Sequence, residues 1–409
     1  MDRGTDANSI LFISFPFPPE NASGSWRPYF FAKYLPQHGY CARVLASSYV
    51  AGFEDCPHVS RVPTALPRSF AMRCGDRAAA VIQRIVPYNE QLPWAPHALS
   101  AAQRILQETP VRAIYSTGPP VVSHIVAMLL KLRTGLPWVA DFQDPLCGNP
   151  FRNRRRGRYY DRALEFSLFA NADALIANTD TVAGLWRKRY PHWFRKMHVL
   201  MNGFDPEDCV MPYPLPQRKH AVIGHIGAVY GGRRPDIFLS SVERLIRSGT
   251  LRPDAIRVRF VGDFENETMG IGRQPFSTLD AQGCLEYDNR RLPMPEARQE
   301  MGKVDYLLLL DINDRNLDLQ IPAKVFDYLR IGRPILVYTP KGSPLARLLI
   351  KTGVPHQTVY PDDPEPARDE RLIALLRLSS EPVQPSPWFL EQFDASRQTR
   401  TLVEILERL

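Results

Sequence analysis

Short apolar runs alternate with amphipathic stretches along most of the chain. A first series of runs has the length and content of buried strands and covers residues 10–15, 41–47, 113–117, 137–141, 174–178 and 198–203. A second series covers residues 221–227, 257–262, 306–311 and 334–339. Helical patterns separate the runs, as at residues 26–39, where Gly39 is suited to end a helix. The alternation predicts an α/β protein with parallel sheets covered by helices on both faces.

The pattern also predicts how the chain divides into domains. Residues 204–220 hold four prolines and little periodicity, which is typical of an interdomain linker. We predict an N-terminal Rossmann-like domain over 1–204, a C-terminal Rossmann-like domain over 205–388 and a last helix over 389–409. Residues 48–110 show no strand pattern, and their arginines outnumber nearby acids, which indicates a helical insertion in the first domain. These arginines are Arg61, Arg68, Arg73, Arg77 and Arg84.

Composition narrows the class of partner and the compartment. The formal net charge is +8, which favours anionic partners such as phosphates, nucleic acid or an acidic membrane surface. The six cysteines form no CxxC pair, and no metal-ligand spacing is present, which is typical of a reducing compartment. The start of the sequence is polar, and no apolar run reaches the roughly 18 residues of a membrane span. We therefore expect a cytoplasmic protein, either soluble or peripheral on the inner face of the membrane.

The stretch GHIGAVYGGRRPD, residues 224–236, joins a strand pattern to a helix pattern. Gly227 ends the predicted strand, where a missing side chain lets backbone N–H groups approach a ligand. Arg233 and Arg234 follow, and guanidinium groups match phosphate oxygens in pairs. An anion site and a plain glycine turn with exposed arginines explain this stretch equally well.

A second stretch, LQIPAKVFDYLRIGRPIL at residues 319–336, favours the anion site. Lys324 lies in the first turn of the predicted helix, where a cation opposes the helix dipole by about 0.3–1 kcal/mol. A bound phosphate would reverse that sign, because helix N-termini collect anions. Asp327 shares the helix face, and its carboxylate could accept hydrogen bonds from two ribose hydroxyls. The alternative is a solvated Lys324–Asp327 pair.

Two stretches of the first domain carry further candidates. Asp141 and Asp144 follow a strand, where a carboxylate serves as a general base, orients a sugar hydroxyl or caps a helix. His124 is interpreted as a packed or capping residue rather than a catalytic one. Gly24, Ser25 and Arg27 lie between a strand and a helix in residues 16–30. That stretch contains no GxGxxG, so it is not a dinucleotide fingerprint, and no Walker A sequence is present.

These stretches together resemble the retaining, nucleotide-sugar-dependent glycosyltransferases of the GT-B fold, in the family 4-like group. The resemblance rests on FPFPPENASGSWRPYFFAKYLPQHGY, STGPP, GLPWVADFQDP, NADALIANT, LMNGFD, HIGAVYGGRRP, FVGDF and IPAKVFDYLRIGRPIL. It implies two Rossmann-like domains whose parallel sheets face each other across a cleft. The acceptor would bind mainly to the first domain and the nucleotide-sugar to the second. The last helix would cross back to the first domain.

The resemblance also implies roles for individual residues. Arg233 and Lys324 match the basic pair that neutralises the donor diphosphate, with Arg234 as a substitute for the first position. Asp327 matches the acid that binds the ribose, and Asp144 matches a residue that touches the sugar. Gly227, Gly262 and Asp318 complete the expected donor side, and Gly24, Ser25 and Arg27 the acceptor side. The family often has a glutamate eight residues before the ribose-binding acid, where this chain has Leu319 and, one residue away, Asp318.

The function expected from this resemblance is transfer of a sugar from a nucleoside-diphosphate sugar to an acceptor hydroxyl, with retention and without a metal. The reaction would belong to the synthesis of a polysaccharide, a glycolipid or a natural-product glycoside. No permanently bound cofactor and no nucleic-acid partner are expected. The acceptor is a glycan, a lipid-linked intermediate or a small molecule, and the arginine-rich residues 151–166 indicate an anionic membrane surface as a partner. Two alternatives remain open: a nucleotide-sugar epimerase of the same fold, and a catalytically silent nucleotide-binding partner protein.

Overall fold

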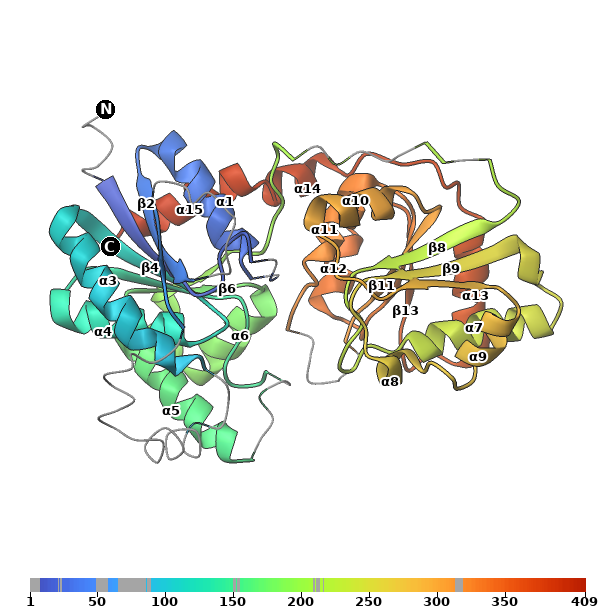
Figure 1. Ribbon diagram of the computed structural model, residues 1–409, viewed down its shortest axis with the longest axis horizontal. Coiled ribbons are helices and arrows are strands. Elements are labelled where there is room, and N and C mark those ends of the chain that lie inside the picture. The colour runs from blue at the N-terminus through green and yellow to red at the C-terminus, as the bar shows by residue number, and fades with distance from the viewer. Residues whose placement is uncertain are drawn as a thin grey trace. The chain divides into compact units, whose positions relative to one another are not determined.

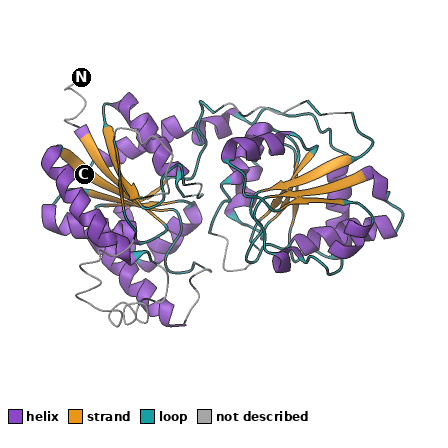
Figure 2. Cartoon of the chain, in the orientation of Figure 1, coloured by secondary structure: helices purple, strands orange, loops and turns teal. Residues whose placement is uncertain are grey.

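The chain folds into two compact units. The computed structural model describes residues 8–20, 22, 24–48, 58–64, 86, 90–149, 152, 155–208, 210, 214–215, 217–312 and 319–409. The first unit combines Met1–Asp205 with the C-terminal segment Asp394–Leu409, and the second unit is the continuous segment Pro206–Phe393. Each unit holds a sheet between layers of helices (Figure 2). The end of the chain therefore completes the unit in which the chain begins.

The sheet of the first unit is parallel throughout its described strands, in the order β3-β2-β1-β4-β5-β6-β7. The strands are β1 (Ser9–Ser14), β2 (Cys41–Ser47), β3 (Val59–Val62), β4 (Val111–Gly118), β5 (Trp138–Phe142), β6 (Ala174–Ala177) and β7 (Met197–Val199). The central strands β1, β5 and β6 are buried along their whole length. Burial on both faces explains why these strands read as continuous apolar runs instead of alternating ones.

Helices cover this sheet on both faces (Figure 1). They are α1 (Trp26–Tyr34), η2 (Leu35–His38), η3 (Leu92–Trp94), α3 (Ala95–Glu108), α4 (Val122–Thr134), α5 (Arg155–Asn171), α6 (Asp180–Arg189), η5 (Pro191–Lys196) and α15 (Ala395–Leu406). The red helix α15 packs beside the blue helix α1, and its Leu402 and Leu406 join the core formed by Phe12 and Tyr115. Gly39 ends the first helical segment, as the sequence predicts.

The structure corrects the expectation for residues 48–110. Strand β3 and helix α3 both lie in this stretch, and β3 pairs with β2 through the register Val44↔Val59 to Ser47↔Val62. Most of β3 is only half-buried because it is the edge strand, so its sequence VSRV carries no apolar run. Arg61 belongs to β3 and bonds the carbonyl oxygen of Ser47 over 3.3 Å. The other four arginines of the predicted insertion lie outside the described residues.

The second unit has a parallel sheet in the order β10-β9-β8-β11-β12-β13. Its strands are β8 (Ala221–Ile226), β9 (Ile256–Val261), β10 (Leu285–Asp288), β11 (Tyr306–Leu310), β12 (Ile335–Tyr338) and β13 (His356–Val359). The four predicted strands are the four central ones. The strands missing from the prediction, β10 and β13, are the two edges, where partly exposed positions such as Glu286 and Gln357 interrupt the apolar pattern.

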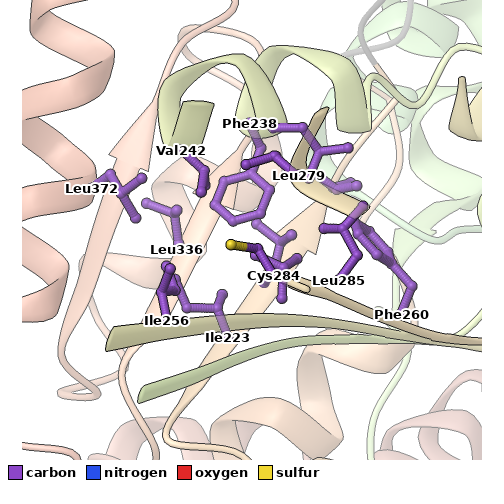
Figure 3. Packing of buried hydrophobic residues seen from close by; sticks show 14 of the residues in the cluster. Ile223, Phe238, Val242, Ile256, Phe260, Leu279, Cys284, Leu285, Leu336 and Leu372 are labelled. Atoms are coloured by element: carbon purple, nitrogen blue, oxygen red, sulfur yellow. The ribbon is translucent and has the colours of Figure 1, made fainter. Parts of the chain in front are cut away.

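One core cluster of the second unit lies between the sheet and helices α7 and α9. Phe238 and Val242 of α7 pack in one cluster with Ile223 of β8 and Leu279 of α9 (Figure 3). The helices of this unit are α7 (Pro235–Arg247), η6 (Pro253–Ala255), α8 (Asn266–Met269), α9 (Phe276–Ala281), α10 (Met294–Gly302), α11 (Lys324–Ile331), α12 (Pro344–Leu349), α13 (Glu365–Leu376) and α14 (Pro387–Gln392). Within the described part of the chain, no helix has both the length and the apolar character needed to span a membrane.

Strand order reverses at one point in each sheet. The chain runs outward from β1 to β3 and then returns to β4 on the other side of β1. It likewise runs from β8 to β10 and returns to β11 on the other side of β8. Ligands of open parallel sheets bind at such switch points, beyond the carboxyl ends of the strands. In the second unit, a ligand-binding site is therefore expected at the loops that follow β8 and β11.

Candidate functional site

A glycine follows each of the strands β8 and β9, so the backbone at their carboxyl ends carries no side chain. Gly227 and Gly262 have φ angles of 121° and 137°, which L side chains rarely adopt. A Cβ on Gly262 would lie 2.6 Å from the carbonyl carbon of Gly227. A Cβ on Gly227 would lie 2.6 Å from Nζ of Lys324. The two backbones and the lysine thus approach closely because no side chain lies between them.

The ammonium of Lys324 is held by a histidine. Lys324 begins α11, and its Nζ lies 3.0 Å from Nε2 of His225, which is fully buried on β8. The other ring nitrogen, Nδ1, lies 2.9 Å from the carbonyl oxygen of Leu308 on β11. Because a carbonyl only accepts, Nδ1 carries the hydrogen and the Nε2 lone pair accepts from Lys324. A neutral His225 therefore fixes where the cation of Lys324 points.

Arg233 supplies a second buried cation at the same switch point. Its side chain follows β8, and its Nε donates to the carbonyl oxygen of Leu310 at the end of β11 over 3.1 Å. The guanidinium carbon lies 4.4 Å from the centre of the Tyr230 ring. Arg233 is 8% exposed, and its Nη1 has no hydrogen-bond partner among the residues that the structure describes. An unsatisfied buried guanidinium nitrogen is costly, so this atom is available to donate to a ligand.

The charges around these cations favour an anion. Burial and then the charge of Arg233 hold the pKa of Lys324 well below its ordinary value. Burial, Lys324 and Arg233 also lower the pKa of His225, in that order. Among the described residues, neither Lys324 nor Arg233 forms an ion pair with a carboxylate. Two neighbouring cations without an acid between them form a site that a phosphate group would neutralise.

The remaining donor-side candidates are placed differently. Arg234 is exposed and binds Asp236 through two hydrogen bonds of 2.8 and 2.7 Å, so it does not join the buried cations. Asp327 lies 2.9 Å from Nε of Arg298, whose Nη1 lies 2.7 Å from Asp208. Burial raises the pKa of Asp327, and Arg298 opposes the shift. Asp318 lies outside the described residues.

The solvated Lys324–Asp327 pair considered from the sequence does not form, since each side chain has another partner. The hydroxyl of Tyr328 also accepts from the backbone N–H of Ile226 over 3.0 Å and so ties α11 to β8. Sequence reasoning missed His225, Arg298 and Tyr328. The one available signal was a histidine inside the apolar run before Gly227.

In the first unit, Arg27 and Asp141 form a buried ion pair. Nε of Arg27 lies 2.6 Å from one carboxylate oxygen of Asp141, and Nη2 lies 3.1 Å from the other. Tyr115 donates its hydroxyl hydrogen to the same carboxylate. Arg27 also donates to the carbonyl oxygens of Leu200 and Met201 over 2.6 and 2.7 Å, and its Nη1 lies 3.5 Å from the side-chain oxygen of Asn202. All of its donors are engaged inside the fold, which favours a structural role over the expected acceptor contact.

Asp144 and its neighbours follow β5. Burial raises the pKa of Asp144 to about 6, so this carboxyl titrates near neutrality. The side-chain nitrogen of Gln143 donates to the carbonyl oxygen of Gly24 over 2.8 Å, which places Gly24 beside the β5 loop. Ser25 is fully buried, and its hydroxyl bonds the carbonyl oxygens of Ala22 and Glu20. Ser25 therefore shapes the loop, whereas Asp144 is the titratable group of this region.

His124 is a packed residue, as the sequence indicates. Its ring stacks on Phe142 with the centroids 4.2 Å apart, and its Nδ1 lies 2.8 Å from the hydroxyl of Ser116. Burial lowers its pKa to about 3, so the imidazole is neutral. Within the described ranges, no group of three or more His, Cys, Asp or Glu residues is placed to hold an ion.

The chain is similar to known proteins in one family and one fold. Residues 31–203 match the family model for the glycosyl transferase 4-like domain. By sequence, no curated protein matches the chain. Among solved structures, sucrose-phosphate synthase from Thermosynechococcus elongatus matches with a TM-score of 0.62 at 12% identity, covering 98% of this chain and 97% of that chain.

Two further solved structures match over nearly the whole length. HepE of Anabaena, in complex with UDP-glucose, has a TM-score of 0.62 at 13% identity, with 98% of this chain and 100% of that chain covered. WaaG, a glycosyltransferase involved in lipopolysaccharide biosynthesis, has a TM-score of 0.57 at 15% identity, with 98% and 97% covered. These likenesses and the two parallel sheets define the GT-B fold, which confirms the expected fold class. Residues 31–203 therefore form a glycosyl transferase 4-like domain, and the whole chain has the fold of the matched structures.

Proposed function

We propose that the chain transfers a sugar from a nucleoside-diphosphate sugar to an acceptor hydroxyl. The observation that carries this proposal is the pair of buried cations, Arg233 and Lys324, at the switch point of the second unit. Neither forms an ion pair with a carboxylate of the described chain. Within the described residues, one guanidinium nitrogen of Arg233 has no hydrogen-bond partner, and Lys324 lies against the backbone of Gly227. A diphosphate group supplies the charge and the acceptor oxygens that this arrangement lacks.

The same pair would drive the chemical step. Negative charge develops on the diphosphate as its bond to the sugar breaks, and fixed cations in a buried site stabilise that charge strongly. We propose that Lys324 and Arg233 supply the positive charge that a divalent metal supplies in other transferases, so the reaction needs no metal. His225 holds Lys324 in place before the donor arrives, which lowers the reorganisation required. Retention of configuration is proposed from the likeness to family 4-like enzymes.

Two carboxylates are proposed to contact the donor. Asp327 lies three residues after Lys324 on α11, and the ribose hydroxyls would bind it beside Arg298. Asp144 belongs to the first unit, and its raised pKa suits a group that exchanges a hydrogen bond with a sugar hydroxyl. Gly262 is proposed to keep the edge of the diphosphate site free of side chains. Asp318, Arg234, Gly24, Ser25 and Arg27 carry no step of this mechanism.

The first domain is proposed to bind the acceptor, which is a glycan, a lipid-linked intermediate or a small molecule. The pathway would be the synthesis of a polysaccharide, a glycolipid or a natural-product glycoside, in the cytoplasm. HepE, one of the matched structures, contains UDP-glucose, so UDP-sugars are the first donors to test. The comparisons do not favour the epimerase or the silent partner protein.

A thermal-shift screen tests the donor site directly. The purified chain is heated with UDP, GDP, dTDP, ADP or CDP, each with Mg²⁺ and with a chelator. We expect one diphosphate to raise the melting temperature, and Arg233→Ala to lose that shift. Arg234→Ala is the matched control, because its exposed guanidinium is bound to Asp236, and it should keep the shift. The proposal fails if no diphosphate stabilises the wild type, or if both variants respond like it; a response that requires Mg²⁺ would overturn the metal-free mechanism alone.

A further inference from the structure

The outward side of α5 carries cations and aromatic rings in one stripe. Arg155, Arg158, Tyr159, Arg162 and Phe166 are all exposed and recur at helical spacing, and we call this set the basic face. Tyr159 is 82% exposed and Phe166 is 52% exposed, which is far above the usual exposure of aromatic side chains. We propose that the basic face docks the chain on an anionic lipid bilayer.

The acids of the same helix face the other way. Asp161 lies 2.6 Å from Nη2 of Arg152, and Glu165 lies 2.5 Å from Nη1 of Arg189. Both carboxylates are almost fully buried, with side-chain exposures of 3% and 0%. Among the described side chains of α5, no acid is therefore exposed to offset the arginines. The basic face presents a nearly uncompensated positive charge to solvent.

The neighbouring helix η5 also exposes basic and aromatic side chains. The ring of Phe166 lies 5.3 Å from that of Trp193, which joins the basic face to η5. Phe194 is 53% exposed, and the guanidinium of Arg195 lies 5.9 Å from the centre of its ring. Helices α5 and η5 thus both expose basic and aromatic side chains, and the two helices are in contact through Phe166 and Trp193.

An anionic bilayer suits both kinds of side chain. Each Arg near such a surface contributes about 1 kcal/mol of attraction. Aromatic rings favour the membrane–water interface, where Phe166 and Phe194 can leave water. Duplex nucleic acid would also attract the arginines, but its stacked bases leave no apolar surface for exposed phenylalanines; single-stranded bases can stack on such rings, so an oligonucleotide is one arm of the test. The combination favours a helix that lies on a membrane surface, and this inference does not depend on the identity of the sugar donor.

Vesicle flotation of the full chain at low salt tests the docking face. The vesicles contain either phosphatidylcholine alone or phosphatidylcholine with phosphatidylglycerol. We expect the wild type to float only with the anionic vesicles, and Arg158→Glu/Arg162→Glu to lose about tenfold or more of that partition. Arg252→Glu/Arg371→Glu makes the same charge change at exposed positions of the second unit and should bind nearly as well as wild type.

A second variant separates ring insertion from charge. Tyr159→Ala keeps the net charge and should weaken partition at both low and high salt, with Tyr287→Ala, an exposed tyrosine of the second unit, as its control. The proposal is overturned if the wild type does not float with anionic vesicles, or if both double variants lose binding equally. It is also overturned if a fluorescent single-stranded oligonucleotide binds through Arg158 and Arg162 while the vesicles do not. Thermal unfolding of each variant, and its diphosphate response, show whether the fold and the donor site are intact.

Discussion

The ammonium of Lys324 lies 3.0 Å from Nε2 of His225, and the opposite ring nitrogen of His225 bonds the carbonyl oxygen of Leu308. This chain of contacts runs from β11 through β8 to the first residue of α11. It converts a flexible lysine into a cation with a fixed position above Gly227. His225 touches no proposed atom of the donor, so its role is to position Lys324.

Replacing His225 should therefore weaken donor binding without removing the cation. We expect His225→Phe to reduce the affinity for the nucleoside diphosphate about two- to tenfold, the equivalent of one hydrogen bond. The donor KM should rise more than kcat falls. His225→Gln supplies a new acceptor and should recover part of the loss. Calorimetric titration measures both affinities, and equal binding by wild type and His225→Phe would rule out this positioning role.

Lys324→Met should change the thermal stability of the free protein and its binding of the diphosphate in opposite directions. The substitution keeps the length of the side chain but removes a cation that is buried beside Arg233. At a pH below the lowered pKa of Lys324, where the free lysine is charged, we expect Lys324→Met to melt at a higher temperature than wild type, because the repulsion by Arg233 and the desolvation cost disappear. Stabilisation by the diphosphate should be about tenfold or more weaker in affinity terms than in wild type, so that binding is still measurable at high ligand concentration. Arg234→Met is the matched control and should change neither value; a less stable Lys324→Met protein with a normal diphosphate response would contradict the assignment.

Diphosphate binding should take up a proton. In the free protein the pKa of Lys324 is lowered, and a bound diphosphate would raise it. Between those two pKa values the free lysine is neutral and the bound one is charged, so affinity rises as the pH falls through that window and levels off below it. Among the described residues, the other groups that face Lys324 are His225, which burial keeps neutral, and the permanently charged Arg233.

Calorimetry in two buffers of different ionisation enthalpy measures this uptake. The titration belongs above the phosphate pKa of about 6, so that the nucleotide itself stays ionised. Lys324→Met should bind without uptake, because it has no group that titrates at this point. The same proton uptake in wild type and Lys324→Met would show that another group is responsible.

The dependence of kcat/KM on pH below neutrality should reflect the titration of Asp144. Burial raises the pKa of this carboxyl to about 6, so it is protonated below that pH and ionised above it. If the carboxylate accepts a hydrogen bond from the sugar, kcat/KM of the wild type should rise as the pH passes through about 6. Asp144→Asn should lower kcat/KM and flatten this limb. Steady-state rates across pH provide the test, and an unchanged limb in Asp144→Asn would assign the titration elsewhere.

Arg27 should matter for stability rather than for the acceptor. Its partner Asp141 is fully buried, and removing one member of a buried ion pair costs about 3–5 kcal/mol. We expect Arg27→Met to lose that much free energy of unfolding in urea, while Arg112→Met, an exposed arginine of the same unit, loses little. The diphosphate response should persist in both. A stable Arg27→Met protein with a raised acceptor KM would restore the acceptor role.

The sequence predicted the central strands of both sheets because parallel strands buried on both faces read as apolar runs. The edge strands β3, β10 and β13 were missed for the same reason, since half-exposed positions break the run. Lys324 was chosen from the misfit of a cation at a helix start, and Arg233 from a pair of arginines after a glycine turn; their roles stay predictions. Their shared position was not predicted, because it depends on strand order.

Partners distant in the sequence were beyond prediction. Nothing local to Asp327 indicates that Arg298 of α10 reaches it, and nothing local to Arg27 indicates the carboxylate of Asp141. In the sequence, His225 is a single polar residue within the apolar run of a predicted strand. Its proposed role depends on the backbone carbonyl of Leu308, which fixes the tautomer of the imidazole. Every residue has such a carbonyl, so the sequence does not show which one His225 contacts.

The segment Asp394–Leu409 belongs to the first unit, and this has a consequence for how the protein is made. A ribosome delivers Pro206–Phe393 complete before Leu402 and Leu406 emerge to fill the core around Phe12. The unit that is synthesised first is therefore finished last. A fragment that stops at Asp205 would lack part of its own core, whereas the second unit is one uninterrupted segment of the chain.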